Sequence, residues 1–147
     1  MSMSSRRSFV AGGAVALLAI AVPAAAQVQV PATARNRALF SVTDNDPGRW
    51  NLILNNMSAL REGLGNEDAE IELVAYGPGL LMLKADSPVK QRIAEALKSG
   101  VRINACQNTM NGMKLTPADI LPEVGYVPSG VVEVMRRQQQ GWAYIRS

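Results

Sequence analysis

Strand-like and helix-like segments alternate along this chain from about residue 37 to residue 145, and this alternation limits the possible folds more than any other feature. Apolar residues at every second position are typical of strands, and apolar residues spaced three or four apart are typical of helices. By these patterns we expect strands at 37–43, 70–76, 101–106, 125–127 and 142–145. Strands that alternate with helices predict a mainly parallel sheet with helices on both faces, an α/β fold.

The segments between the strands carry start and stop signals of helices. Asp46 and Pro47 precede a long apolar run at helical spacing, which ends at Gly63–Gly65. Ser87 is expected to cap a second helix, with Pro88 in its first position. Shorter helices or helical turns are expected near 80–84, from Asn108, near 116–121 and from Ser129–Gly130 to Gly141.

The second strand, Glu70–Tyr76, has an apolar face and an acidic face. Alternate residues from Ile71 to Ala75 share the apolar side, and Glu70 and Glu72 lie on the other. Carboxylates are rarely buried unless they are paired, so we expect the acidic face to be partly wet. The pattern therefore favours a strand near the edge of the sheet over a central one.

The composition excludes several kinds of active site. The chain has 147 residues, which suit a single domain, with no histidine and one cysteine, Cys106. This excludes Ser-His-Asp and Cys-His triads, histidine-containing zinc sites, an intrachain disulfide and a Cys-x-x-Cys pair. Gly77-Pro78-Gly79 lacks the spacing of a phosphate-binding loop and is better interpreted as a tight turn. No motif supports nucleotide, flavin or metal binding, so we expect no cofactor.

The first 26 residues resemble an export signal. Arg6-Arg7 precedes the apolar run Ala11–Val22, which is shorter than the roughly 20 residues of a membrane span. Ala24-Ala25-Ala26 has the A-x-A pattern of a cleavage site. The arginine pair with Phe9 is similar to a twin-arginine signal, and an ordinary secretory signal is the alternative. We expect cleavage near residue 26, a flexible tether at 27–36 and a periplasmic domain at 37–147 that meets a membrane only during export.

The charge balance argues against a nucleic-acid partner. The full chain has a formal net charge of +3, but the two arginines of the signal account for most of it. Removal of 26 residues would leave 121 residues with 13 basic and 12 acidic side chains. No basic stripe is interleaved with aromatic residues, so we expect no nucleic-acid binding.

Three polar segments follow strands and should meet in space. In a parallel sheet with right-handed crossovers, the carboxyl ends of the strands lie along one edge, where such folds bind ligands. The segments are Asp44–Asn45, Tyr76–Gly79 and Cys106–Asn108. We therefore expect a ligand site or a catalytic site at this edge.

Cys106 has the most distinctive chemistry of the three segments. It ends a strand just before a helix, where unpaired N–H groups and the positive end of the helix dipole favour a nucleophilic thiolate. The alternative is a buried apolar filler, the usual role of a lone cysteine in a small domain. The position of Cys106 leaves both interpretations open.

Three asparagines could assist a thiolate. Asn45, Asn104 and Asn108 could each donate a hydrogen bond to a thiolate or a persulfide. Turn and cap chemistry is the alternative for Asn45 and Asn108. We expect Asn108 to act with Cys106 as a catalytic residue that stabilises the anion, and Asn45 is a candidate substrate-binding residue.

Other residues are candidates for the walls of the site. Tyr76 could form a wall of a substrate site or simply pack, with Gly77 beside it. Lys114 would lie about two helical turns after Cys106 in a continuous helix, where its charge could help, and a solvated surface lysine is the alternative. Asp44 and Asp46 are expected to serve as helix caps rather than as catalytic groups.

Five segments, taken in order, carry a family resemblance: Val42-Thr-Asp-Asn-Asp-Pro47, Glu72-Leu-Val-Ala-Tyr-Gly-Pro-Gly79, Gly100-Val-Arg-Ile-Asn-Ala-Cys-Gln-Asn-Thr-Met110, Gly125-Tyr-Val-Pro-Ser-Gly-Val-Val-Glu133 and Gly141-Trp-Ala-Tyr-Ile145. Together they resemble the DsrE/DsrF-like family of small α/β proteins, and within it the exported single-domain branch. The resemblance extends from about Arg37 to the C-terminus.

The resemblance implies a three-layer α/β/α fold with a mainly parallel five-stranded sheet, and assembly into a homo-oligomer, a trimer or a hexamer. In the best understood members it also implies a sulfur relay, in which one cysteine carries a persulfide at the position of Cys106. The expected function is a sulfur carrier or sulfurtransferase-like protein of the cell envelope, with a thiol-bearing sulfur donor or acceptor protein as its partner. A non-catalytic binding module and a thiol redox sensor are the alternatives.

Overall fold

The structure, a computed structural model, describes residues 36–65 and 67–147. The expected signal segment and nearly all of the expected tether lie outside these residues. The elements are β1 (Asn36–Val42), α1 (Pro47–Leu64), β2 (Ala69–Ala75), η1 (Gly77–Leu83), α2 (Lys90–Lys98), β3 (Arg102–Cys106), α3 (Gln107–Gly112), η2 (Pro117–Asp119), β4 (Gly125–Val127), α4 (Gly130–Gln139) and β5 (Ala143–Ile145). None of the described helices is sufficiently long and apolar to span a membrane.

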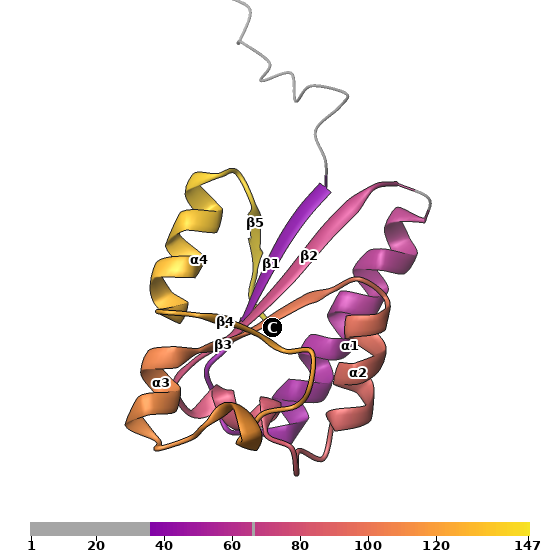
Figure 1. Ribbon diagram of the computed structural model, residues 1–147. Coiled ribbons are helices and arrows are strands. Elements are labelled where there is room, and N and C mark those ends of the chain that lie inside the picture. The colour runs from indigo at the N-terminus through magenta and orange to yellow at the C-terminus, as the bar shows by residue number, and fades with distance from the viewer. Residues whose placement is uncertain (1–35, 66) are drawn as a thin grey trace, which may run out of the picture. The chain divides into compact units, whose positions relative to one another are not determined.

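The five strands form one parallel sheet in the order β4-β3-β2-β1-β5. Figure 1 shows α1 and α2 together on one face of the sheet and α4 on the opposite face. The predicted three-layer α/β/α fold is therefore confirmed. Since every strand runs in the same direction, the segments that follow β1, β2, β3 and β4 all leave the sheet at the same edge.

Most helices begin where local chemistry predicts. The Asp46 carboxylate accepts hydrogen bonds from the N–H groups of Gly48 at 2.8 Å and Arg49 at 3.4 Å, so it caps α1 as expected. The expected start of α2 is wrong by two residues. The Lys90 N–H donates to the Ser87 carbonyl at 3.2 Å, an i to i+3 bond that makes a tight turn before the first α-helical bond.

The face of the sheet beneath α1 and α2 is apolar. Alternate strand residues pack there against the buried side of α1, and this cluster holds most of the buried apolar side chains. Its strand members are Ala38, Phe40, Val42, Ile71, Leu73, Ala75, Ile103, Ala105 and, at the end of β3, Cys106. The face beneath α4 has a much smaller apolar cluster, built around Leu39, Val74, Val127 and Trp142.

The expectation that the second strand lies near the sheet edge is wrong. β2 is the central strand, and Glu72 is fully buried beneath α4. Its carboxylate is paired with Arg137 of α4, with 2.9 Å between Glu72 Oε2 and Arg137 Nε. A carboxylate can be buried when an opposite charge and hydrogen bonds replace its hydration, and here both come from elements distant in the sequence.

Candidate functional site

Cys106 is the last residue of β3 and the N-cap of α3, at the carboxyl edge of the sheet. The side chain is nearly covered, because the residue is only 4% exposed. β4 pairs with β3 in register, with Val127 opposite Cys106, so the chain that leaves β4 enters α4 beside the thiol. The start of α4 therefore reaches the sulfur directly.

The best-defined contact of the thiol comes from the first residue of α4. The N–H of Gly130 donates to Cys106 Sγ at 3.2 Å. The first N–H groups of a helix have no partner within the helix, and they carry its partial positive charge. A thiolate at Cys106 would satisfy one of these donors and interact favourably with the dipole of α4.

The surroundings favour the ionised form of the thiol. Burial is the largest single influence and raises the pKa of Cys106, but the Thr109 hydroxyl, the Gly130 N–H and the N–H groups of Thr109 and Asn108 together outweigh it. The pKa of Cys106 is therefore below its ordinary value. Of these groups, the Gly130 N–H makes a well-formed hydrogen bond to the sulfur, at 3.2 Å. The Thr109 and Asn108 groups, in the first turn of α3, also lower the pKa of the thiol.

Thr109 connects the thiol to the turn that follows β2. Its Oγ1 accepts a hydrogen bond from the Gly77 N–H at 3.0 Å, and its hydroxyl lowers the pKa of Cys106. Gly77 has a φ of 55°, a conformation that glycine adopts without steric cost. The Gly77 N–H thus fixes the position of the Thr109 oxygen and leaves its hydrogen available to the sulfur.

Tyr76 packs against the start of α4. A Cβ atom on Gly130 would lie 2.8 Å from Cβ and Cδ1 of Tyr76, so only glycine fits there without displacing the ring. Tyr76 also lines a cavity of about 210 Å³ at the same edge, together with Ser41, Asp44, Arg49, Tyr144 and Arg146 among others. Tyr76 thus borders this cavity and packs against the residue whose N–H contacts the thiol, and its expected role as a wall of a substrate site stays a prediction.

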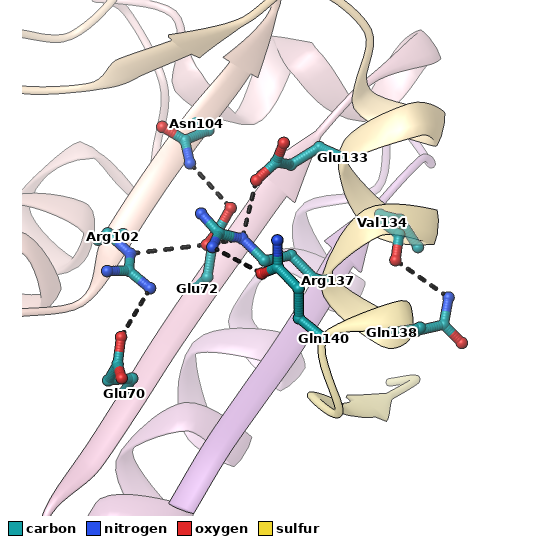
Figure 2. A network of polar contacts seen from close by, with 9 residues as sticks. All are labelled: Glu70, Glu72, Arg102, Asn104, Glu133, Val134, Arg137, Gln138 and Gln140. Atoms are coloured by element: carbon teal, nitrogen blue, oxygen red, sulfur yellow. Dashed lines mark hydrogen bonds and ion pairs between the residues drawn. The ribbon is translucent and has the colours of Figure 1, made fainter. Parts of the chain in front are cut away.

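The predicted asparagines have different positions. Asn108 is exposed, and its backbone N–H donates to the Pro128 carbonyl at 3.2 Å and also lowers the pKa of the thiol. Asn104 Nδ2 donates to Glu72 Oε1 at 3.0 Å, so this amide belongs to the charged cluster beneath α4 (Figure 2). Asn45 is exposed in the loop between β1 and α1.

Lys114 does not continue the helix that follows Cys106. α3 ends at Gly112, and Lys114 is exposed with a φ of 56°. The condition of a continuous helix as far as Lys114 is therefore not met, and an influence of its charge on the site stays a prediction. A second cavity, of about 360 Å³, opens beside α3 and is lined by Gln107, Met110, Asn111, Leu115, Pro117 and Tyr126.

Sequence reasoning missed Thr109 and Gly130. The N-cap position of Cys106 could have indicated Thr109, since the third residue of a helix faces the side chain of its N-cap. The parallel β3–β4 pair could have indicated Gly130, since consecutive parallel strands place their following segments side by side. Among residues 36–65 and 67–147, no group of three or more Cys, Asp or Glu side chains could hold a metal ion.

Comparisons with known proteins agree with the fold. The sequence model of the DsrE/DsrF-like family matches residues 37–146. A solved structure of a protein of unknown function, MTH1491 from Methanobacterium thermoautotrophicum, is 37% identical, with a TM-score of 0.72 over 76% of this chain and 98% of that one.

Two more distant structures share the fold. The ychN protein from E. coli is 16% identical, with a TM-score of 0.61 over 76% of this chain and 99% of its own. BT1422, a protein of unknown function from Bacteroides thetaiotaomicron, is 15% identical, with a TM-score of 0.63 over 76% of this chain and 95% of its own. No curated protein matches the chain.

Proposed function

The chain belongs to the DsrE/DsrF-like family, and from this premise we propose that it is a sulfur carrier in which Cys106 holds sulfane sulfur as a persulfide. The observation that supports this most directly is the Gly130 N–H aimed at Cys106 Sγ. A lowered thiol pKa increases the fraction of thiolate near neutral pH, and the thiolate is the form that attacks sulfur.

The proposed loading step needs no external oxidant or reductant. The Cys106 thiolate attacks the outer sulfur of a small persulfide, R–S–SH, and a new S–S bond forms as the S–S bond of the donor breaks. The donor leaves as R–S⁻ with the electron pair of the broken bond, and the proton stays on the transferred sulfur. In the delivery step an acceptor thiolate attacks that outer sulfur, and Cys106 leaves as a thiolate.

The polar groups around the sulfur suit both steps. Gly130, Thr109 and Asn108 direct N–H or O–H groups at negative charge on Cys106, which is the attacking group in loading and the leaving group in delivery. Fixed donors that stabilise the same charge in both directions favour transfer over a permanent disulfide. Tyr76 and Gln107, the residues that border Cys106 at the ends of β2 and β3, each line a cavity that could hold a small donor.

Mass spectrometry tests the proposal directly, because the chain has a single cysteine. After incubation with a small persulfide and removal of the excess, the intact protein should gain about 32 Da, one sulfur atom, as persulfidation requires. The Cys106→Ser protein should gain nothing, and a thiol acceptor should remove the added mass from the wild type. A folded wild-type protein that stays at its original mass would reject the sulfur-carrier function.

We also propose that the protein works as a homo-oligomer. Val131 and Met135 on the outer side of α4 are 60% and 49% exposed, and apolar side chains of this size favour a protein contact. Light scattering of the purified protein should give the mass of a trimer or a hexamer. A monomer at tens of micromolar, a concentration at which stable interfaces are formed, would reject it.

An exported location is the third part of the proposal. It is based on Arg6-Arg7, the short apolar run and the Ala24-Ala25-Ala26 pattern. N-terminal sequencing of the periplasmic fraction should find a chain that begins near Gln27. Replacing Arg6 and Arg7 with lysine should block export if the protein uses the twin-arginine route. Unchanged export would indicate the ordinary secretory route instead.

A further inference from the structure

α4 is held on the sheet by few apolar contacts. Of its residues, only Gly130 is buried, and Val134 is the one that packs against the apolar cluster of this face. Val131 and Met135 point away from the sheet. The apolar attachment of α4 is therefore small, and something else must set its position.

A buried ion pair supplies a second attachment, at the far end of α4 (Figure 2). Arg137 Nε lies 2.9 Å from Glu72 Oε2 of the central strand and 2.8 Å from Glu133 Oε1 of its own helix. Within the described residues neither Glu72 Oε2 nor Arg137 Nε has an aligned hydrogen bond, so the contact is an ion pair shared between two carboxylates. Glu72 also accepts from Asn104 and lies 3.6 Å from Arg102 Nε.

Trp142 restricts the same arginine from another side. The Arg137 guanidinium lies over its ring, 4.9 Å from the ring centroid, and the backbone N–H of Trp142 donates to the backbone carbonyl of Arg137 at 3.0 Å. Arg102 also faces this ring, at 5.1 Å. A guanidinium placed between a carboxylate and an aromatic face has little freedom to move, because both contacts depend on its orientation.

The other end of α4 touches the thiol. Gly130 and Arg137 are seven residues apart on one helix, about two turns or 10 Å of rigid backbone. A shift or rotation at Arg137 is therefore transmitted to the Gly130 N–H, which must stay within hydrogen-bond reach of Cys106 Sγ. The close packing of Gly130 on Tyr76 leaves little room for adjustment at that end.

From these contacts we propose that Glu72 and Arg137 are positioning residues for Cys106, because their ion pair sets the height and rotation at which α4 presents the Gly130 N–H to the sulfur. The proposal builds on the function proposed for Cys106, but its test measures thiol ionisation and not sulfur transfer. A buried ion pair contributes little net stability compared with apolar residues of similar volume, which agrees with a role in fixing geometry.

The experiment compares pH profiles of Cys106 alkylation in four proteins: the wild type, Arg137→Met, the double variant Glu72→Leu/Arg137→Met, and Arg136→Met as the matched control. The midpoint of each profile gives the thiol pKa, while the plateau at high pH reports access to the sulfur. Arg136 is exposed on the same helix and has no ion pair with the sheet in the described residues, so its variant should keep the wild-type midpoint.

Arg137→Met should raise the midpoint by up to about one pH unit. At pH values well below the midpoint, this corresponds to a tenfold smaller fraction of thiolate. The double variant removes one charge of each sign and leaves no buried carboxylate on the sheet. Glu133 loses Arg137 as its partner, but its side chain is partly exposed to water. The double variant should fold stably and still show the raised midpoint, which separates positioning from a direct charge effect and keeps the test valid if Arg137→Met does not fold.

A folded double variant with the wild-type midpoint would overturn the proposal, and so would an equal rise in Arg136→Met. Sulfur loading of the wild type is measured separately. A protein that accepts no sulfur but shows the expected midpoints would reject the sulfur-carrier function and leave the positioning role standing. A protein that accepts sulfur while all four midpoints coincide would reject only the positioning role.

Discussion

Beneath α1 and α2 the buried side chains of the sheet are apolar, whereas beneath α4 the sheet has a buried carboxylate with its arginine partners. The single cysteine, at the end of β3, belongs to the larger apolar cluster and accepts its hydrogen bond from the start of α4. The first face supplies most of the area removed from water and therefore most of the stability. The second has less apolar area and more directional contacts. The comparison indicates that one face stabilises the fold and the other positions the thiol.

The largest expected effect is on the apolar face. Phe40→Ala should lower the free energy of unfolding by about 3–5 kcal/mol, since it removes a fully buried ring and leaves a cavity. Urea unfolding measures this loss. In the folded fraction the midpoint of Cys106 alkylation should stay at its wild-type value, and a shifted midpoint would show that the two faces are not independent.

A smaller effect is expected at the contact between α4 and Tyr76. Gly130→Ala should cost about 1–3 kcal/mol, because its Cβ would lie 2.8 Å from the Tyr76 side chain and force α4 outwards. The same movement lengthens the contact to Cys106 Sγ, so the thiol pKa should rise. Gly63→Ala is the control, since nothing lies within 4 Å of that Cβ. Equal losses in the two variants would contradict the tight packing at Gly130.

Thr109→Val tests the hydroxyl that the sequence did not reveal. It should cost about 1–2 kcal/mol, because the Gly77 N–H loses its acceptor. It should also raise the pKa of Cys106, because the Thr109 hydroxyl favours the thiolate. Thr109→Ser keeps the hydroxyl and should preserve the alkylation midpoint. If valine preserves it as well, the hydroxyl has no influence on the thiol.

The smallest effect concerns pH and Glu72. Burial raises the pKa of Glu72 above its ordinary value of 4.5, against the opposing influences of Arg137, Asn104 and Arg102. A carboxyl group with a raised pKa in the folded state stabilises the fold fully below its unfolded pKa, and this stabilisation is lost as pH rises through the folded pKa. The stability of the wild type relative to Glu72→Gln should therefore fall as pH rises from 4.5. A constant difference between the two curves would contradict this assignment.

The element pattern and the place of Cys106 followed from the sequence. The alternation of strand and helix patterns predicted a parallel sheet, and a parallel sheet places all strand ends at one edge. The Asp46 cap was also predictable, because a capping side chain bonds to N–H groups only two or three residues away in the sequence. These features depend on neighbours within a few residues or on the shared direction of strands, and both can be seen in a linear pattern.

The tertiary structure alone decided the environments of Glu72 and Cys106. A period of two shows which side chains share a face of a strand, but not what covers that face, so Glu72 looked solvated until α4 placed Arg137 over it. The donor to the thiol is the backbone N–H of Gly130. Because every residue except proline has such a group, the amino-acid type does not mark this one as functional. Strand order and helix placement determine both contacts, because charges and hydrogen bonds act over a few ångströms of space between residues that are distant in the chain.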